Sequence, residues 1–345
     1  MPTPYIFDGH NDAILRLWKG GVAGVVERFQ NSETGHIDLA KAKAGGLAGG
    51  FFAMFVPPVE SFSMPSFTPP YDEPLPAELD QQYALKIVVE QAGILLTLDR
   101  AGVLAVCRNH AEISSAIANG KMAAIMHLEG AEAIDRELIA LETLYAAGLR
   151  SIGPVWSRPT VFGHGVPFRY PSDGDTGPGL TPEGKALAAR CLELGVILDT
   201  SHLNIAGFWD VAAAGLPLVA THSNAHAISP GARNLTDDQL RAIGETGGMV
   251  GLNFGTMFLR EDGKAAPEGG IEAAMRHLSH MIELAGEDHV GLGSDFDGAP
   301  MPHNMETAAA LPNLRQAMKD HQFGEAVIAK ICHKNWLAFI GRTLG

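Results

Sequence analysis

Eight short apolar runs rich in strand-forming residues recur along the chain, and segments with helical periodicity separate them. The runs cover residues 4–10, 46–56, 122–129, 149–156, 195–202, 217–223, 247–254 and 289–296. Repeated alternation of strands and helices predicts a parallel sheet covered by helices, and eight repeats close a (β/α)8 barrel of the TIM type. An open doubly wound sheet is the competing fold, but no glycine-rich phosphate loop follows the first run.

The helical segments between the runs carry chemical signals at their ends. The clearest helices are expected at residues 83–99, 136–148, 184–195, 237–247 and 272–286. Thr236 and Gln239 have the spacing of a capping box, and Thr181 before Pro182 is typical of a helix start. These signals support the α/β alternation.

Two long segments interrupt the alternation, at residues 57–80 and 157–183. Both are rich in proline and contain aromatic residues, which predicts ordered loops. Loops of this length in a compact domain are usually functional. Because both follow predicted strands, we expect them on the C-terminal face of the barrel, where active sites form.

Length and composition bound the class of protein. The 345 residues are expected to form a single domain, residues 1–345, and the net charge of −14 argues against binding to nucleic acid or an anionic membrane. No apolar run is long enough for a transmembrane helix, and no signal peptide is recognised. Three widely spaced cysteines predict no disulfide framework. A cytoplasmic protein is the expectation.

Ligand-type residues stand at the ends of five predicted strands. The first ends in His10 and Asp12, two residues apart and so on one face; alone, this pair is better explained by a local hydrogen bond. The other strand ends contribute Glu129, His202, His222 and Asp295. Because the carboxyl ends of parallel barrel strands share one rim, we expect all six side chains to converge there.

Such a set is larger than one metal needs. Three histidines and two or three carboxylates exceed the ligands of one tetrahedral zinc with an open position. They suit two metals bridged by a carboxylate, with a hydroxide between them, which would activate water and polarise a carbonyl. The chemistry therefore indicates a metal-centred hydrolase.

Several motifs give the chain a family resemblance. They are "HND" after the first strand, "HLEG", "DTSH", "THSNAHAISPGARNLTDDQL" and "HVGLGSDFDG", in that order from residue 6 to about residue 300. The chain thereby resembles the membrane (renal) dipeptidase family, peptidase family M19, of the amidohydrolase superfamily. The H-x-D start and the "HSNAH…ARN" block are the most specific parts of this resemblance.

The resemblance implies a role for each matching residue. His10 and Asp12 would bind one Zn²⁺, His202 and His222 would bind a second Zn²⁺, and Glu129 would bridge the two ions. Asp295 would accept a proton from the bridging hydroxide and pass it to the leaving amine. The planar guanidinium of Arg233 would hold the substrate carboxylate, and Asn234 would support the substrate site.

The fourth strand departs from the family. Many members have a histidine there that is thought to polarise the scissile carbonyl, whereas this chain reads "GPVWSRP", with Trp156 at that position. Trp156 would then line the substrate pocket. Gly255, after "LNF", is a second departure, because relatives often carry a bulkier residue there. His164 is the favoured replacement for the missing histidine, and His127 and Arg158 are the other candidates.

The predicted activity is hydrolysis of free dipeptides, L-Xaa-L-Xaa or L-Xaa-D-Xaa. The alternatives are an amidohydrolase of N-acyl amino acids or other small amides, and a metal-binding homologue without catalysis. The predicted partner is a small-molecule dipeptide, and a homodimer is left open.

The remaining histidines outside the site motifs are expected mostly at the surface: His36, His110, His277, His280, His303, His321 and His333.

Overall fold

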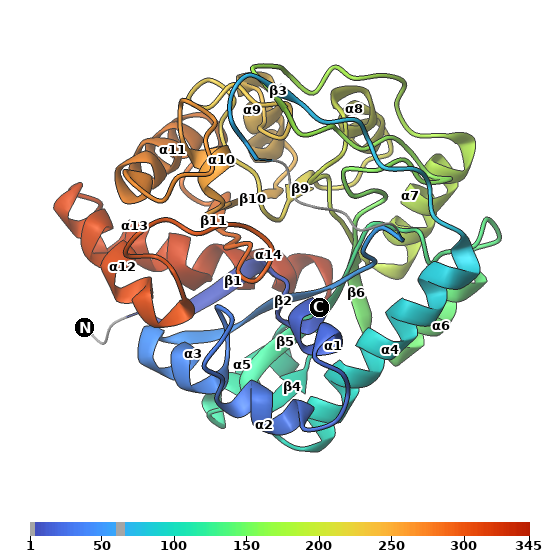
Figure 1. Cartoon of the computed structure of the whole chain (residues 1–345), viewed down its shortest axis with the longest axis horizontal. Helices are drawn as coiled ribbons and strands as arrows, with labels where there is room; N and C mark the ends of the chain where they lie inside the picture. Colours follow the sequence, from blue (N-terminus) through green and yellow to red (C-terminus); the bar gives the residue numbers. More distant parts are fainter. Residues whose placement is uncertain (1–3, 60–65) are drawn as a thin grey trace.

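The computed structural model describes residues 4–59 and 66–345. A closed barrel of parallel strands forms its centre, and helices surround it (Figure 1). All eight predicted runs contain a barrel strand: β1 (Ile6–Asn11), β2 (Leu47–Phe55), β5 (Met122–Glu129), β6 (Leu149–Ile152), β8 (Ile197–Leu198), β9 (Val219–Ala220), β10 (Met249–Leu252) and β11 (Val290–Leu292). The (β/α)8 prediction is confirmed.

The order of the strands shows how the barrel closes. Hydrogen-bonded neighbours run β8-β6-β5-β2-β1-β11-β10-β9, and a parallel bridge between Asp199 and Val219 joins the two end strands. A short additional strand, β4 (Leu104–Val106), pairs with the start of β5. All these pairings are parallel, so the strand ends that carry the predicted site share one face.

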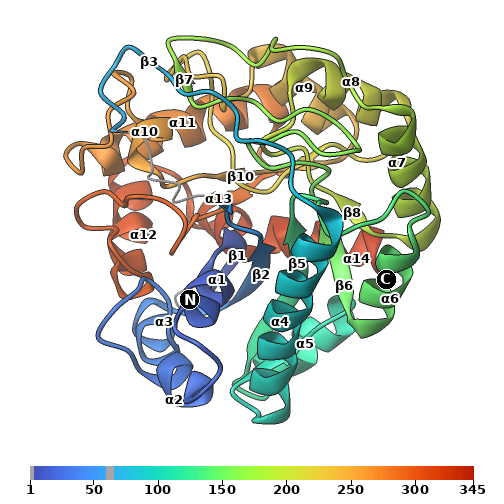
Figure 2. The same ribbon diagram turned by 45° about the vertical axis from the view of Figure 1, so that its right-hand side comes forward.

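Helices between the strands and after the last strand cover the barrel (Figures 1 and 2). They are α1 (Ala13–Lys19), α2 (Val25–Gln30), α3 (Leu39–Gly45), α4 (Gln81–Arg100), α5 (His110–Ala118), α6 (Ile139–Ala147), α7 (Pro182–Leu194), α8 (Ile205–Ala213), α9 (Asp237–Glu245), α10 (Thr256–Leu259), α11 (Gly270–Ala285), α12 (Leu311–Asp320), α13 (Glu325–Ala329) and α14 (Asn335–Thr343). A 3₁₀ turn (Ala308–Ala310) and a π-helical turn (Lys330–Lys334) complete them. The Thr236 capping box and the Thr181 N-cap are both present.

Helix α14 closes the N-terminal end of the barrel. The Trp336 side chain is fully buried and donates a hydrogen bond from Nε1 to the Leu292 carbonyl at 2.9 Å. Phe7 and Phe51 from the strands pack with Trp336 in one buried cluster. A Cβ at Gly9 would lie 2.6 Å from the Trp336 ring, so only glycine fits at this position of β1. This end is filled by side chains, and the site is confined to the opposite face.

The two long loops pair with each other. Strand β3 (Tyr71–Asp72) and strand β7 (Arg169–Tyr170) form a small antiparallel sheet that joins loop 57–80 to loop 157–183. Part of the first loop, residues 60–65, lies outside the described residues.

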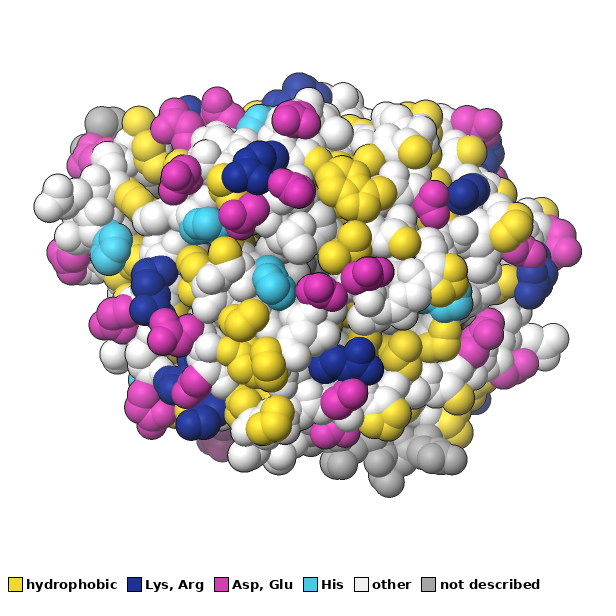
Figure 3. All heavy atoms as spheres, turned by 90° about the horizontal axis from the view of Figure 1, so that it is seen from above, with side chains coloured by type: hydrophobic (Ala, Val, Ile, Leu, Met, Phe, Trp, Pro, Cys, Tyr) yellow, Lys and Arg dark blue, Asp and Glu magenta, His cyan; other side chains and the backbone are white. Residues whose placement is uncertain are grey.

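In the described part of the chain, no helix is both long and apolar enough to cross a membrane. Acidic and basic side chains are interspersed on the face drawn in Figure 3.

Candidate metal centre

The six side chains predicted from the strand ends lie together at the C-terminal face of the barrel. His10 belongs to β1 and Glu129 ends β5, whereas the other four lie one to four residues beyond a strand. All six residues are buried: His10, Asp12, Glu129, His202, His222 and Asp295. Their convergence was a prediction from strand order alone, and the geometry agrees with it.

Glu129 stands at the centre of this cluster, and its two carboxylate oxygens face different partners. Oε1 lies 3.1 Å from His202 Nε2 and 3.5 Å from His222 Nε2. Oε2 lies 3.7 Å from His10 Nε2, and that nitrogen is 3.3 Å from Asp12 Oδ2. The cluster thus divides into two pairs of ligand-type side chains that share one carboxylate.

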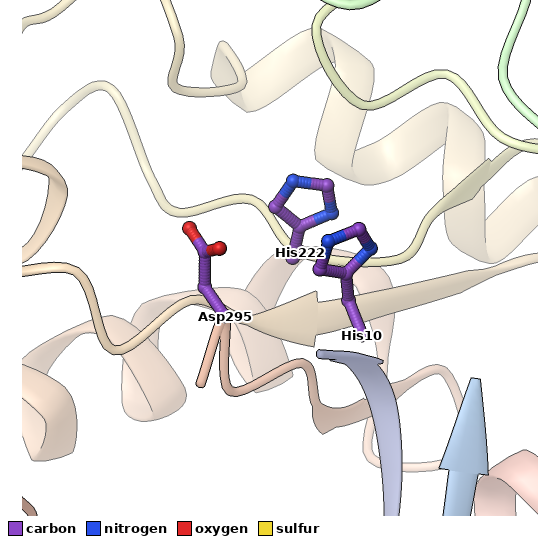
Figure 4. A group of neighbouring side chains, drawn as sticks. All are labelled: His10, His222 and Asp295. Carbon is purple, nitrogen blue, oxygen red and sulfur yellow. The ribbon is translucent and has the colours of Figure 1, made fainter. Parts of the chain in front are cut away.

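The ligand atoms are close enough to surround a cation. Three groups each have ligand atoms within 4.8 Å of one another: His10 with Asp12 and Glu129, Glu129 with His202 and His222, and His10 with His222 and Asp295. Figure 4 shows the last group, with the Asp295 carboxylate and the two imidazoles converging. Both ring nitrogens of His10 are buried, and neither has a hydrogen-bond partner among the residues that the structure describes. A buried nitrogen atom without a hydrogen-bond partner is suited to binding a metal ion, and zinc is commonly bound by imidazole and carboxylate groups together.

The protonation of the cluster also fits cation binding. Burial lowers the pKa of His10, His202 and His222, so their imidazoles are neutral near pH 7 and keep a lone pair. Burial, with the neighbouring carboxylates of Asp12 and Asp295, raises the pKa of Glu129 well above its usual range. Burial raises the pKa of Asp12 to about 7. Carboxylates crowded in this way repel one another until a cation lies among them.

A chain of hydrogen bonds sets the orientation of the His222 ring. Asp199 Oδ1 accepts the backbone N–H groups of Ser201 and Thr221, and its Oδ2 accepts the Thr221 hydroxyl at 2.6 Å. The Thr221 hydroxyl oxygen in turn lies 2.9 Å from His222 Nδ1. Since the hydroxyl proton is directed to Asp199, the oxygen accepts from Nδ1–H, and Nε2 keeps its lone pair toward Glu129.

His202 has a different environment. Its backbone has a φ of 66°, a left-handed conformation that is uncommon for a residue with a side chain and clusters at functional sites. The Ser157 hydroxyl lies 2.8 Å from Nδ1, and Arg233 Nε lies 3.0 Å from the same nitrogen. The other Arg233 nitrogens donate to Ser223 Oγ and to the His222 carbonyl. Arg233 therefore contacts both histidines, at the ring of His202 and at the backbone carbonyl of His222.

Two residues that we did not predict hold the strand ends that carry Asp295 and His10. Asn253 Nδ2 donates to Asp295 Oδ2 at 2.9 Å. The Asp8 carboxylate accepts both the backbone N–H and the hydroxyl of Ser294, each at 2.7 Å. Asp8 precedes His10 by two residues on the same face of β1. This spacing was the one feature of the sequence that could have indicated a role for Asp8 near the site.

A cavity of about 410 Å³ opens onto the cluster. Its polar lining includes Asp12, Glu129, His202 and Asp295, and Trp156 lines it as well. Over the described residues, Arg233, Asn234 and His164 are not among the side chains that line it. Arg233 and Asn234 lie next to His202 in a neighbouring crevice. His164 is partly exposed, and its carbonyl accepts the backbone N–H of Asn204.

The model of the membrane dipeptidase family, peptidase family M19, matches residues 1–343. The chain belongs to this family. A metallopeptidase of Rhodobacter sphaeroides, solved with a phosphinate mimic of the dipeptide L-Ala-D-Ala, is 50% identical with a TM-score of 0.96, over 99% of each chain. The M19 peptidase described here is a metal-dependent dipeptidase, as the family resemblance implied.

The chain is also similar to curated proteins over most of its length. An uncharacterized protein of Acinetobacter calcoaceticus is 40% identical over 81% of this chain and 89% of the relative. An uncharacterized dipeptidase of Schizosaccharomyces pombe is 30% identical over 90% of this chain and 73% of the relative.

In this M19 peptidase, the other two candidates for the missing histidine are fully buried, and each makes a structural contact. His127 lies fully buried beside His10, with ring centroids 5.4 Å apart, and burial lowers its pKa to about 3. Its Nδ1 lies 2.9 Å from Ser151 Oγ. Arg158 is fully buried and paired with Glu132 at 2.6 Å. Neither side chain is among the described residues that line the cavity.

One expectation about the remaining histidines is wrong. His277 of α11 is fully buried, where its Nδ1 accepts the backbone N–H of Ala225 and its Nε2 donates to the Leu259 carbonyl. The ring joins the segment after His222 to α10, so its polar atoms are satisfied inside the protein. Helical periodicity does not distinguish this histidine from an exposed one.

Proposed function

We propose that this M19 peptidase is a binuclear zinc dipeptidase that hydrolyses the amide bond of free dipeptides, L-Xaa-L-Xaa or L-Xaa-D-Xaa, through a metal-bridging hydroxide. The observation that carries the proposal is the division of the Glu129 carboxylate between two ligand pairs. A carboxylate that faces two sets of ligands is suited to bridge two metals a few ångströms apart.

The same ligand pairs assign the two ions. His10 and Asp12 would hold one Zn²⁺, His202 and His222 the other, and Glu129 would contribute one oxygen to each. The buried, unpartnered nitrogens of His10 support its place in this set. When bound, two zinc ions would supply the activated hydroxide and polarise the scissile carbonyl.

Asp295 is the proposed proton carrier. Its carboxylate lies within 4.8 Å of ligand atoms of His10 and His222, and the Asn253 amide fixes one of its oxygens. From this position it would accept the proton of the attacking group and deliver it to the leaving amine. Asn253 cannot take up a proton itself, so we infer that its task is orientation.

Arg233, Asn234 and Trp156 are the proposed substrate-binding residues. The guanidinium of Arg233 is suited to a carboxylate, and it lies within hydrogen-bond distance of His202. Asn234 Nδ2 donates to the carbonyls of Ser229 and Phe258, which makes it a support for Arg233 next to it. The Rhodobacter neighbour was solved with a phosphinate mimic of L-Ala-D-Ala, which supports a free dipeptide as the substrate; a free dipeptide ends in a carboxylate.

The role of His164 stays a prediction. His164 is not among the described residues that line the cavity, and this position does not decide whether it takes part in the reaction. If it holds the carbonyl oxygen, His164→Ala will lower kcat sharply while the zinc content stays full. Unchanged turnover would remove it from the site. The cytoplasmic location also stays a prediction, and the oligomeric state stays open.

The experiment that tests the proposal compares L-Ala-D-Ala with its N-acetyl and C-amide forms, using zinc-loaded enzyme. A dipeptidase requires both free ends, so each block is expected to lower kcat/KM at least about a hundredfold, as expected when a buried polar group loses its partner. Rapid cleavage of the N-acetyl form would favour the alternative of an N-acyl amino acid hydrolase. Full zinc with no cleavage of any compound would favour a non-catalytic metal-binding protein.

A further inference from the structure

One side of the cavity is lined by packed aromatic rings. Phe55, Trp156, Phe168 and Phe258 belong to one buried apolar cluster and all line the cavity; we name these four residues the aromatic wall. The Trp156 ring lies 5.0 Å from Phe55 and 5.6 Å from Phe168, and Phe168 lies 6.2 Å from Phe258, measured between centroids. The rings therefore form one continuous surface.

The aromatic wall begins next to the metal cluster. The centroids of the Trp156 and His202 rings are 5.8 Å apart. Neighbouring Cα atoms of a peptide are about 3.8 Å apart, so a dipeptide whose amide lies at the cluster has a side chain within reach of Trp156. The rest of the charged lining consists of carboxylates, with Lys19 exposed at the edge. The wall itself offers apolar surface to whatever side chain meets it.

A buried ion pair holds the aromatic wall from behind. Arg158 Nε and Nη2 donate to Glu132 Oε1 at 2.9 and 2.6 Å, and Nη2 also donates to the Val56 carbonyl at 3.0 Å. The guanidinium carbon lies 5.6 Å from the Trp156 centroid and 5.9 Å from that of Phe55. Arg158 thereby joins the end of β2 to the segment after β6, and it fixes two members of the wall relative to each other.

Close backbone packing holds the Trp156 segment from a second direction. A Cβ at Gly165 would lie 1.9 Å from the Trp156 carbonyl oxygen and 2.7 Å from the Arg158 nitrogen. Only glycine allows this approach of the loop to the backbone at Trp156. A wall held by both the ion pair and the loop keeps its shape, and a pocket of fixed shape discriminates by size.

We propose that the aromatic wall selects the substrate: it accepts an uncharged apolar side chain on one residue of the dipeptide, and Trp156 limits the size of that side chain. This proposal rests on the proposed dipeptidase function. A charged side chain placed against the wall loses its water and gains no partner. A bulkier apolar side chain meets the Trp156 ring, which Arg158 and Phe168 prevent from moving aside.

The test is a substrate profile of the zinc-loaded enzyme. One residue of a free dipeptide is kept as alanine, the other is varied among Ala, Leu, Phe, Asp and Lys, and both positions are varied in turn. In one of the positions we expect kcat/KM for Ala to exceed that for Asp and Lys at least tenfold, and Phe to be poorer than Ala. A preference for Asp would identify Lys19 as the determinant and overturn the proposal.

Trp156→Ala supplies the second arm of the test. It is expected to raise kcat/KM for the Phe substrate relative to the Ala substrate about tenfold, the scale of a changed apolar contact in a pocket, with zinc content unchanged. Trp156→Phe, which keeps an aromatic ring, is expected to give a smaller shift in the same direction and serves if the alanine variant folds poorly. Trp209→Ala, at an exposed tryptophan of α8, is the matched control and leaves the profile unchanged.

The outcomes separate this proposal from the function on which it rests. Cleavage of dipeptides with no dependence on side chain, or with no shift in either Trp156 variant, would overturn the aromatic wall alone. No cleavage of any dipeptide by the zinc-loaded enzyme would overturn the proposed function.

Discussion

The Thr221 hydroxyl oxygen lies 2.9 Å from Nδ1 of the adjacent His222 and donates its own proton to Asp199. The contact determines which ring nitrogen of His222 carries hydrogen. It leaves Nε2 available at the side where Glu129 lies. A ligand oriented before the metal arrives binds more tightly than one that must rotate.

Thr221→Val keeps the shape of the side chain and removes this contact. We expect the zinc affinity to fall about ten- to a hundredfold, the usual effect of losing a hydrogen-bond partner of a ligand. Competition with a chromophoric chelator measures the dissociation constants of the bound zinc ions. Thr143→Val, at an exposed threonine of α6, is the control. Equal affinities in wild type and Thr221→Val would contradict the orienting role.

Asp295→Asn removes the proposed proton carrier while keeping its size. We expect kcat to fall about 10²- to 10⁴-fold, the range for loss of a general acid–base group, with both zinc ions retained. Steady-state kinetics and metal analysis of the same sample are the measurements. Loss of one zinc ion would instead identify Asp295 as a ligand, in line with its closeness to His10 and His222.

Arg158→Met breaks the ion pair behind the aromatic wall. Both side chains of the pair are fully buried, so an unpaired Glu132 carboxylate would remain, and we expect a loss of about 3 to 5 kcal/mol in the free energy of unfolding. The double variant Arg158→Met, Glu132→Leu removes both charges and should recover much of that loss. Urea denaturation measures both values.

Arg136→Met is the matched control for this pair. Arg136 pairs with Glu183 at the surface, where its side chain is 62% exposed, and loss of such a pair costs about 0 to 1 kcal/mol. Similar losses in the free energy of unfolding for Arg158→Met and Arg136→Met would contradict a stabilising role for the buried Arg158–Glu132 ion pair.

His277 predicts a pH dependence of stability. Burial lowers its pKa to about 4 from the usual 6.5, so between these values the unfolded chain binds a proton that the folded chain does not. This contribution to stability is complete above about pH 6.5 and is lost as the pH falls toward 4. His277→Gln, which can still donate and accept, should flatten the pH slope of the unfolding free energy by up to about 1.4 kcal/mol per pH unit.

Urea denaturation at several pH values between 4.5 and 7 measures this slope. His321→Gln, at an exposed histidine after α12, should leave the slope as in wild type. An unchanged slope in His277→Gln would show that another group is responsible.

The barrel and the cluster were predictable because they depend on strand order. Eight runs define the barrel, and a parallel barrel brings all strand ends to one rim, so His10 and His222 meet although they are 212 residues apart in the sequence. The strand order alone did not predict how the two Glu129 oxygens divide between their partners, because this depends on side-chain rotamers; only the family resemblance implied a bridging carboxylate. The same holds for His277, whose partners lie on other elements.

Contacts between loops were the hardest to predict. The Arg158–Glu132 pair joins two loop segments that follow β6 and β5, and no periodic pattern places such residues together. The pairing of β3 with β7 similarly depends on how two long loops meet over the barrel. These contacts shape the substrate cavity, so the type of reaction was predictable from the sequence and the form of the cavity was not.

The most direct test of the proposed binuclear centre is the zinc content per chain of the active enzyme, determined together with its hydrolysis of L-Ala-D-Ala. We predict two zinc ions per chain, and loss of hydrolysis when a chelator removes them. Because Glu129 would bind both ions, we predict that Glu129→Gln weakens the binding of both zinc ions. An enzyme that is fully active with a single zinc ion, or a Glu129→Gln variant that keeps both ions, would contradict the account.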